Sequence, residues 1–154
     1  MKKKIFSFLI FLFLSSCGYE AIYSKKNRID YNFSISELNF NGDKYINLKI
    51  KQRLNSYTLA KKNKDFQLKI LSTLKKSIIA KDIAGDATNF KIETVVTVEV
   101  VKNNKFENNF FILESFSYNN NSDKFKLKSY ENEIKNNLTK TIVEKLIFKL
   151  SNIQ

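Results

Sequence analysis

The N-terminus constrains this chain more than any other stretch of its sequence. Three lysines (residues 2–4) precede a run that is apolar apart from Ser7 and that ends in Leu14-Ser15-Ser16-Cys17. A charged head, a short apolar middle and small residues before a cleavage point are the parts of an export signal. About ten apolar residues span roughly 15 Å as a helix, half of what a membrane span needs. The run therefore predicts a signal that is removed, not an anchor that stays.

Cys17 is the only cysteine in the chain, and it follows two serines at the end of the apolar run. This arrangement resembles the lipobox of bacterial lipoproteins, in which the thiol is diacylated, the signal is cut and the new N-terminus is acylated. The alternative is a free cysteine after an uncleaved apolar N-terminus. Two or more acyl chains make a stable membrane anchor. The residue after Cys17 is Gly18. An aspartate at that position would resemble an inner-membrane retention signal, so its absence favours the periplasmic face of the outer membrane.

We therefore expect a signal peptide at residues 1–16, a lipidated tether at 17–30 and one α+β domain at 31–154. Without the three signal lysines, 24 of the 27 basic residues remain against 15 acidic ones, a net charge of +9. A basic surface favours an anionic partner such as a phosphorylated glycolipid. A compositional bias is the competing explanation, because the chain is rich in Lys, Asn, Ile and Phe and has only Arg28 and Arg53 as arginines.

The residue types that most catalytic sites need are missing from the sequence. There is no histidine, the three glycines are too dispersed to cradle a phosphate, and no Gly-x-Ser-x-Gly elbow occurs. We therefore expect no enzymatic activity, no cofactor and no metal site. With Cys17 acylated, no disulfide is expected either, so the fold depends on its apolar core.

Apolar periodicity predicts the first half of the domain. Residues 31–40 alternate like a half-buried strand, and their phase shifts near Ser36 and Glu37, which predicts a bulge. Asp43 is the predicted N-cap of the helix that follows. The apolar stripe of that helix consists of Ile46, Ile50, Leu54 and Tyr57. A basic helix with such a stripe fits a membrane surface or a core, and the need to cover the neighbouring strands favours the core.

Three strands and a long helix are predicted for the second half. The strands cover residues 66–79, 90–101 and 106–118, with a loop at 81–89 and a tight turn at 102–105 between them. The inward face of the last strand is predicted to carry Phe106, Phe110, Ile112, Phe116 and Tyr118. Phe111 and Leu113 lie on its other face, which is typical of a surface that a partner buries. The final helix, from about Phe125 to Leu150, has a stripe formed by Leu127, Tyr130, Ile134, Leu138, Ile142, Leu146 and Leu150.

This order predicts a two-layer α+β sandwich, in which two helices cover one face of a four-stranded mixed sheet (β-α-β-β-β-α). The first two strands are expected to be parallel, because a helix joins them. The domain then has two opposite ends, and the tether enters at the end that holds the 102–105 turn. The other end gathers Lys75, Lys76, Lys81, Lys91, Lys124, Lys126 and Lys128 against Asp82, Asp86 and Asp123, a candidate anion site.

Several of these features together resemble the lipopolysaccharide-assembly lipoprotein family (LptE). They are the Cys17-Gly18-Tyr19 start, Ile22-Tyr23, the Ala80-Lys81-Asp82 turn, the strand around Thr97-Val98 and the long terminal helix. The resemblance implies a plug inside an outer-membrane β-barrel (LptD) that binds lipopolysaccharide (LPS) during its delivery to the cell surface. In that family, basic residues before the third strand and near the start of the last helix contact the glycolipid. Lys81, Lys91, Lys126 and Lys128 are the matching candidates, although this chain has no arginine there.

A periplasmic adaptor lipoprotein is the alternative hypothesis. Such a protein would bind a protein or peptidoglycan partner through the apolar outer face near Phe111 and Leu113. A nucleic-acid partner is not expected, because export separates the chain from that ligand.

Overall fold

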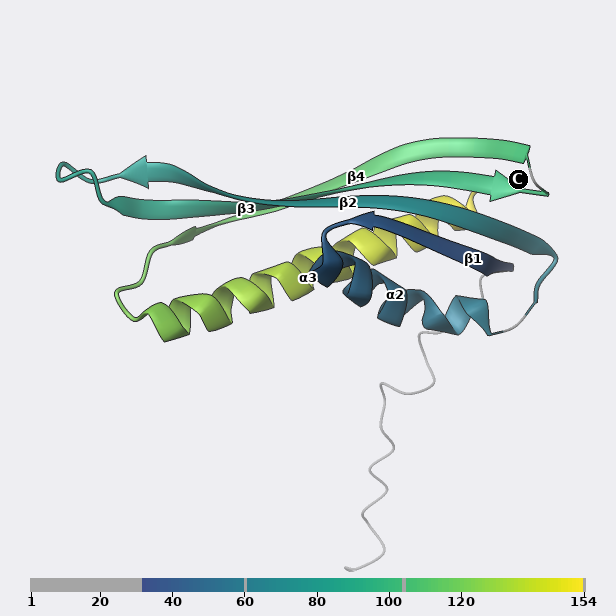
Figure 1. The fold of residues 1–154 in the computed structure, drawn as a ribbon, viewed down its shortest axis with the longest axis horizontal. Coiled ribbons are helices and arrows are strands. Elements are labelled where there is room, and N and C mark those ends of the chain that lie inside the picture. The colour runs from purple at the N-terminus through teal and green to yellow at the C-terminus, as the bar shows by residue number, and fades with distance from the viewer. Residues whose placement is uncertain (1–31, 60, 104, 154) are drawn as a thin grey trace, which may run out of the picture. The chain divides into compact units, whose positions relative to one another are not determined.

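A computed structural model describes residues 32–59, 61–103 and 105–153, which form a four-stranded sheet with two helices on one face (Figure 1). The elements are β1 (Phe33–Gly42), α2 (Lys44–Thr58), β2 (Lys64–Lys81), β3 (Ala87–Lys102), β4 (Lys105–Asn119) and α3 (Lys124–Ser151). The predicted β-α-β-β-β-α order is confirmed. The predicted signal peptide, Cys17 and the tether lie outside the described residues.

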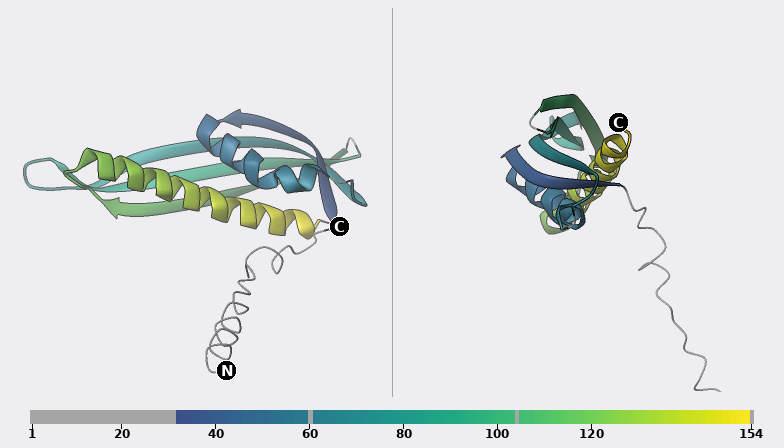
Figure 2. Two further views of the ribbon diagram at one scale, coloured as in Figure 1. Left: turned by 90° about the horizontal axis from the view of Figure 1, so that it is seen from below. Right: turned by 90° about the vertical axis from the view of Figure 1, so that its right-hand side faces the viewer.

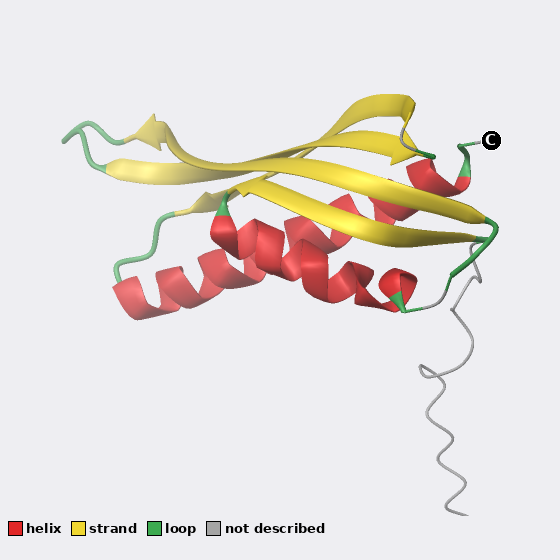
Figure 3. Cartoon of the chain, turned by 45° about the vertical axis from the view of Figure 1, so that its right-hand side comes forward, coloured by secondary structure: helices red, strands yellow, loops and turns green. Residues whose placement is uncertain are grey.

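The strands lie in the order β1-β2-β3-β4, with β1 and β2 parallel and the other pairs antiparallel. The parallel pair follows from α2, which carries the chain back along the sheet before β2 begins. Both helices lie against the same face, as two further views show (Figures 2 and 3). The opposite face, which we call the outer face, is covered by no described element of the chain.

The predicted bulge in β1 is confirmed between Ile35 and Glu37. It lets Ile35 pair with Phe66 and Leu38 pair with Leu68, so that apolar residues on both sides of the bulge face the helices. Without the extra residue, the second half of the strand would turn its apolar side chains to the outer face.

The junction between β1 and α2 depends on two adjacent residues. Gly42 has φ +93°, and a Cβ at this position would lie 1.9 Å from the Ser72 carbonyl oxygen. Only glycine fits there. Asp43 is the N-cap of α2, as predicted, because its Oδ1 accepts a hydrogen bond of 2.9 Å from the Ile46 backbone N–H.

Two clusters of buried side chains fill the space between the helices and the sheet. The larger cluster joins α2, the second half of α3 and all four strands. The smaller one is formed by Ile92, Tyr118, Leu127, Ile134 and Leu138. The predicted stripes on both helices are confirmed apart from Tyr130, which is 44% exposed, with its ring edge-on to Tyr118 at 6.0 Å.

Two details of the prediction are wrong. The 81–89 loop is shorter than expected: β2 continues to Lys81 and β3 begins at Ala87, because hydrogen bonds between Asp82 and Asp86 close a tight turn. Phe106 does not face inward. A register shift between Val100 and Val101 places it opposite Val101 on the outer face, where it is exposed.

Candidate functional site

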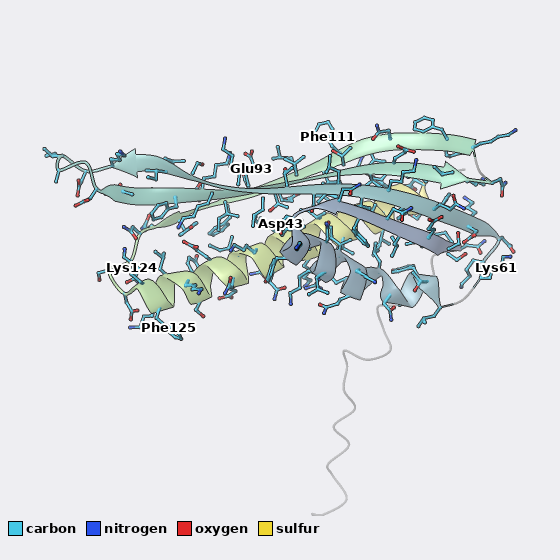
Figure 4. All side chains as sticks on the ribbon, in the orientation of Figure 1. Asp43, Lys61, Glu93, Phe111, Lys124 and Phe125 are labelled. Carbon is cyan, nitrogen blue, oxygen red and sulfur yellow. The ribbon has the colours of Figure 1, made fainter. Side chains whose placement is uncertain are left out.

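The two ends of the domain have different elements and similar charge. The end formed by residues 75–91 and 117–128 is called the far end; it holds the β2–β3 turn and the start of α3. The end formed by residues 59, 61–65, 102–103, 105–107 and 148–153 is called the near end, and β1 begins there. Side chains are shown in Figure 4, where Lys124 and Phe125 lie at the far end and Lys61 at the near end.

At the far end, lysines occupy the start of α3. Asp123 is its N-cap, and its Oδ1 accepts from the backbone N–H groups of Phe125 at 3.0 Å and Lys126 at 3.1 Å. The first turn contains no acidic residue, and Lys124, Lys126 and Lys128 follow the cap instead. The N-terminus of a helix carries a partial positive charge, so lysines there are unfavourable for the helix itself. Backbone and side chains together make this helix start strongly electropositive.

The β2–β3 turn adds a lysine and apolar side chains to the same end. Lys81 is exposed, and it takes part in none of the ion pairs between described residues. Ile83 in the turn is fully exposed and Phe125 at the start of α3 is 83% exposed. Exposed apolar side chains beside lysines suit an amphipathic ligand, whose acyl and phosphate groups need opposite surroundings.

Lys91 lies apart from the other three predicted lysines. It alternates with buried Ile92 and points to the outer face, whereas α3 lies against the inner one. Its Nζ is 2.7 Å from Glu93 Oε2. The hydrogen bond and the charge of Lys91 hold the pKa of Glu93 below its ordinary value. The structure thus brings Lys81, Lys126 and Lys128 to one end and leaves Lys91 ion-paired on the opposite face.

A hollow of about 500 Å³ lies between the end of β4 and the start of α3. The sequence did not predict this hollow. The available signal was the polar run after Tyr118, which indicates an exposed segment there. Aromatic rings, amides and one lysine are groups that bind sugars and their phosphates. The hollow is lined by Phe116, Ser117, Tyr118, Asn119, Asn120, Asn121, Lys126, Leu127 and Tyr130.

A polar brace holds α3 against the sheet behind this hollow. Glu131 Oε1 accepts hydrogen bonds from Tyr118 Oη at 2.7 Å and from Lys76 Nζ at 2.6 Å, and Lys76 also lies 4.1 Å from the centre of the Phe90 ring. Burial works to raise the pKa of Glu131, but the hydrogen bonds from Lys76 and Tyr118 outweigh it and the pKa is lowered. Burial and the bond to Glu131 raise the pKa of Tyr118. Lys76 is therefore part of the scaffold.

The outer face carries an apolar patch across β2, β3 and β4. Two neighbouring rows of the sheet meet there, and ion pairs flank them: Lys69 with Glu99 at 2.7 Å on one side and Lys91 with Glu93 on the other. Phe111, labelled in Figure 4, points away from the helices and is 67% exposed. The patch, called the outer patch below, consists of Leu71, Thr73, Val95, Thr97, Phe111 and Leu113.

Within residues 32–59, 61–103 and 105–153, none of the helices is long and apolar enough to cross a membrane. In the same described residues, no group of three or more His, Cys, Asp or Glu residues is arranged to hold a metal ion.

Comparison with known proteins places the fold. No family model and no curated protein matches the sequence. Among solved structures, the rare lipoprotein B from Shewanella oneidensis is 14% identical, with a TM-score of 0.55 over 75% of this chain and 97% of that one. Lipoprotein B from Nitrosomonas europaea is 12% identical (TM-score 0.54, 82% and 89% covered), and a minor lipoprotein from Acinetobacter baumannii is 15% identical (0.50, 79% and 96%). At these identities the likeness shows a shared fold.

Proposed function

We propose that this chain is a non-enzymatic outer-membrane lipoprotein that plugs and helps assemble an LPS-translocating β-barrel and binds LPS during delivery. Three observations support the proposal: the lipobox at Cys17, a fold shared with proteins that are themselves called lipoproteins, and the basic, partly apolar far end. The lysines at the start of α3 carry the most weight, because positive charge at a helix N-terminus is unfavourable for the helix itself. Of the three, Lys126 alone is in one of the described ion pairs, with Asp123 at 3.5 Å.

LPS has the chemistry that the far end complements. Its lipid part presents phosphates and acyl chains together, and the far end presents Lys81, Lys126 and Lys128 beside exposed Ile83 and Phe125. Lysines bind phosphate as point charges. Lys126 also lines the 500 Å³ hollow, whose aromatic and amide groups suit the sugar. Lys91 is the weakest of the four candidates, because it lies on the outer face and pairs with Glu93 at 2.7 Å. Lys126 is also ion-paired, but its Nζ lies farther from its partner, 3.5 Å from Asp123 Oδ2.

The barrel partner is tested by capture of the full-length lipoprotein from detergent-solubilised outer membrane. The proposal expects one large β-barrel protein in about equal amount. Recovery of a cell-wall component alone would contradict it.

The glycolipid role is tested by LPS binding to the purified lipoprotein. Charge reversal at Lys81, Lys126 and Lys128 should weaken binding at least tenfold, since each lysine contributes a charge-assisted contact. Reversal of Lys44, Lys49 and Lys51 is the matched control, because these three lysines of α2 lie away from both ends and their reversal changes the net charge equally. Equal losses in both variants would show that net charge, not the far end, is responsible.

The outer patch supports a second candidate function, an adaptor that binds a protein or peptidoglycan partner. The patch is apolar, lies in the middle of the sheet and is covered by no described element. Phe111→Asp would place a charge within the patch. If this change abolishes function while reversal of the far-end lysines leaves it intact, the adaptor role is favoured.

A further inference from the structure

The near end is amphipathic although the proposed glycolipid role does not use it. Three large apolar side chains are exposed there: Leu59 at 76%, Phe106 at 65% and Phe148 at 63%. They come from the end of α2, the start of β4 and the last turns of α3. The register shift that turns Phe106 outward is the feature that takes this ring out of the core.

Lysines surround these apolar side chains. The near end contains Lys61, Lys62, Lys64, Lys102, Lys105 and Lys149, against Asp65 and Glu107 as its acidic residues. Lys64 donates a hydrogen bond of 2.6 Å to the Ile153 carbonyl oxygen, whereas Lys61 and Lys105 are exposed. The near end thus combines unburied apolar surface with local positive charge, which is the chemistry of an anionic membrane interface.

A shallow hollow between β4 and the end of α3 continues this surface. It measures about 600 Å³ and is lined by Phe110, Phe148 and Lys149 together with Glu107, Asn108, Asn152 and Ile153. The Nζ of Lys149 lies 5.1 Å from the centre of the Phe110 ring. Long lysine side chains over aromatic rings keep their charge at the surface while their stems cover apolar atoms.

The position of the chain's entry favours a membrane partner for this end. β1 begins at the near end, and the 16 residues from Cys17 to Phe33 reach at most about 55 Å when fully extended. That length lets either end reach the membrane, but the far end lies farther from the anchor by about the 40 Å length of α3. A short tether also raises the effective concentration of the membrane at the near end, so that weak contacts suffice.

We infer that the near end docks on the anionic phospholipid leaflet that carries the lipid anchor, with Leu59, Phe106 and Phe148 entering the interface and the lysines contacting headgroup phosphates. The inference rests on the anchor of the proposed function. Docking precedes entry into the barrel, because a plug inside the lumen is separated from the leaflet by the barrel wall. The docked domain is oriented so that its far end points away from the leaflet.

Single tryptophans test this orientation, because the natural chain has none. Full-length lipoprotein carrying Phe106→Trp or Phe148→Trp is reconstituted in vesicles of phosphatidylethanolamine and phosphatidylglycerol with doxyl-labelled lipid. Phe125→Trp at the far end is the matched control. We expect at least twofold quenching of the near-end tryptophans and little quenching of the control. Adding Lys61→Gln and Lys105→Gln, or replacing phosphatidylglycerol by phosphatidylcholine, should reduce the quenching at least twofold.

Each other outcome overturns the inference. Equal quenching at both ends, or a lipoprotein that does not float with the vesicles, would show that the near end does not dock. If the near-end quenching is unchanged by Lys61→Gln and Lys105→Gln, the near end does not bind anionic headgroups. A blue-shifted near-end tryptophan without quenching would indicate a protein or a second copy there. Barrel capture and LPS binding are measured separately, so the proposed function can fail while near-end quenching persists.

Discussion

Gly42 is the residue at which the backbone geometry leaves least freedom. Gly42→Ala should lower the free energy of unfolding by about 3 kcal/mol or more, because it adds a clash with the Ser72 carbonyl oxygen to the strain of positive φ. Gly85→Ala is the matched control: its φ of +89° is nearly the same, but nothing lies within 4 Å of the added Cβ. It should cost about 1 kcal/mol. Denaturant unfolding measures both, and equal losses would contradict the role of the clash.

Thr94 is a buried side chain whose hydroxyl has no hydrogen-bond partner among the described residues. Thr94→Val keeps the shape and removes the unpaired group, so it should raise the free energy of unfolding by about 1 kcal/mol. Thr139→Val is the control, because that buried hydroxyl donates to the Lys135 carbonyl at 2.7 Å and its removal should not stabilise the fold. A loss of stability at position 94 would mean that the hydroxyl is satisfied.

At the scale of elements, the lysines at the start of α3 lower the stability of the helix and give this end its positive charge. Lys124→Glu should raise the free energy of unfolding by about 0.5–1 kcal/mol, because it complements the helix dipole and adds a Glu-to-Lys pair with Lys128. The same change should weaken LPS binding. Lys149→Glu, in the last turn of α3, should have the opposite effect on stability. Thermal unfolding measures the change in stability and LPS titration measures the change in binding. An unchanged stability of the Lys124→Glu variant would contradict the unfavourable interaction with the helix dipole.

The brace between α3 and the sheet predicts a pH dependence. The pKa of Glu131 is lower in the folded protein than its ordinary value of 4.5. Its carboxylate therefore stabilises the fold above that value, and this contribution is lost as the pH falls through the folded pKa. Glu131→Gln should flatten the stability profile in the acidic range. Glu133→Gln on the exposed side of the same helix is the control, and identical profiles for both variants would contradict the brace.

The elements were predictable where periodicity and local chemistry determine them. The β1 bulge follows from a phase shift in the apolar alternation of the strand. The Asp43 cap follows from the position of an N-cap residue directly before the helix. The outward position of Phe106 depends on inter-strand register, which local sequence does not encode. The pairing of Lys91 with Glu93, two residues apart on β3, follows instead from the two-residue period of a strand. Topology was enough to bring Lys81, Lys126 and Lys128 to one end but not to separate Lys91 from them, and the hollow beside Lys126 needs the packed positions of β4 and α3.

At the scale of the whole molecule, the two basic ends are electrostatically separate. The length of α3, about 40 Å, exceeds the Debye length of about 8 Å at physiological salt several-fold. Charge at one end is therefore screened from ligands at the other, and only contacts at the binding end contribute. In the proposed function, this separation would allow the chain to bind LPS at its far end and anionic phospholipid at its near end independently.

The last prediction follows from this separation. At physiological salt, Lys61→Gln with Lys105→Gln should change the LPS dissociation constant less than about twofold, whereas Lys126→Gln with Lys128→Gln should raise it about tenfold or more, and the combined variant should be additive. At about 0.01 M salt the Debye length grows to about 30 Å, so the near-end changes should begin to weaken LPS binding as well. Titration at both salt concentrations measures this. A near-end effect of equal size at physiological salt would mean that the ends act as one diffuse positive field, and that the far end has no specific role in binding the glycolipid.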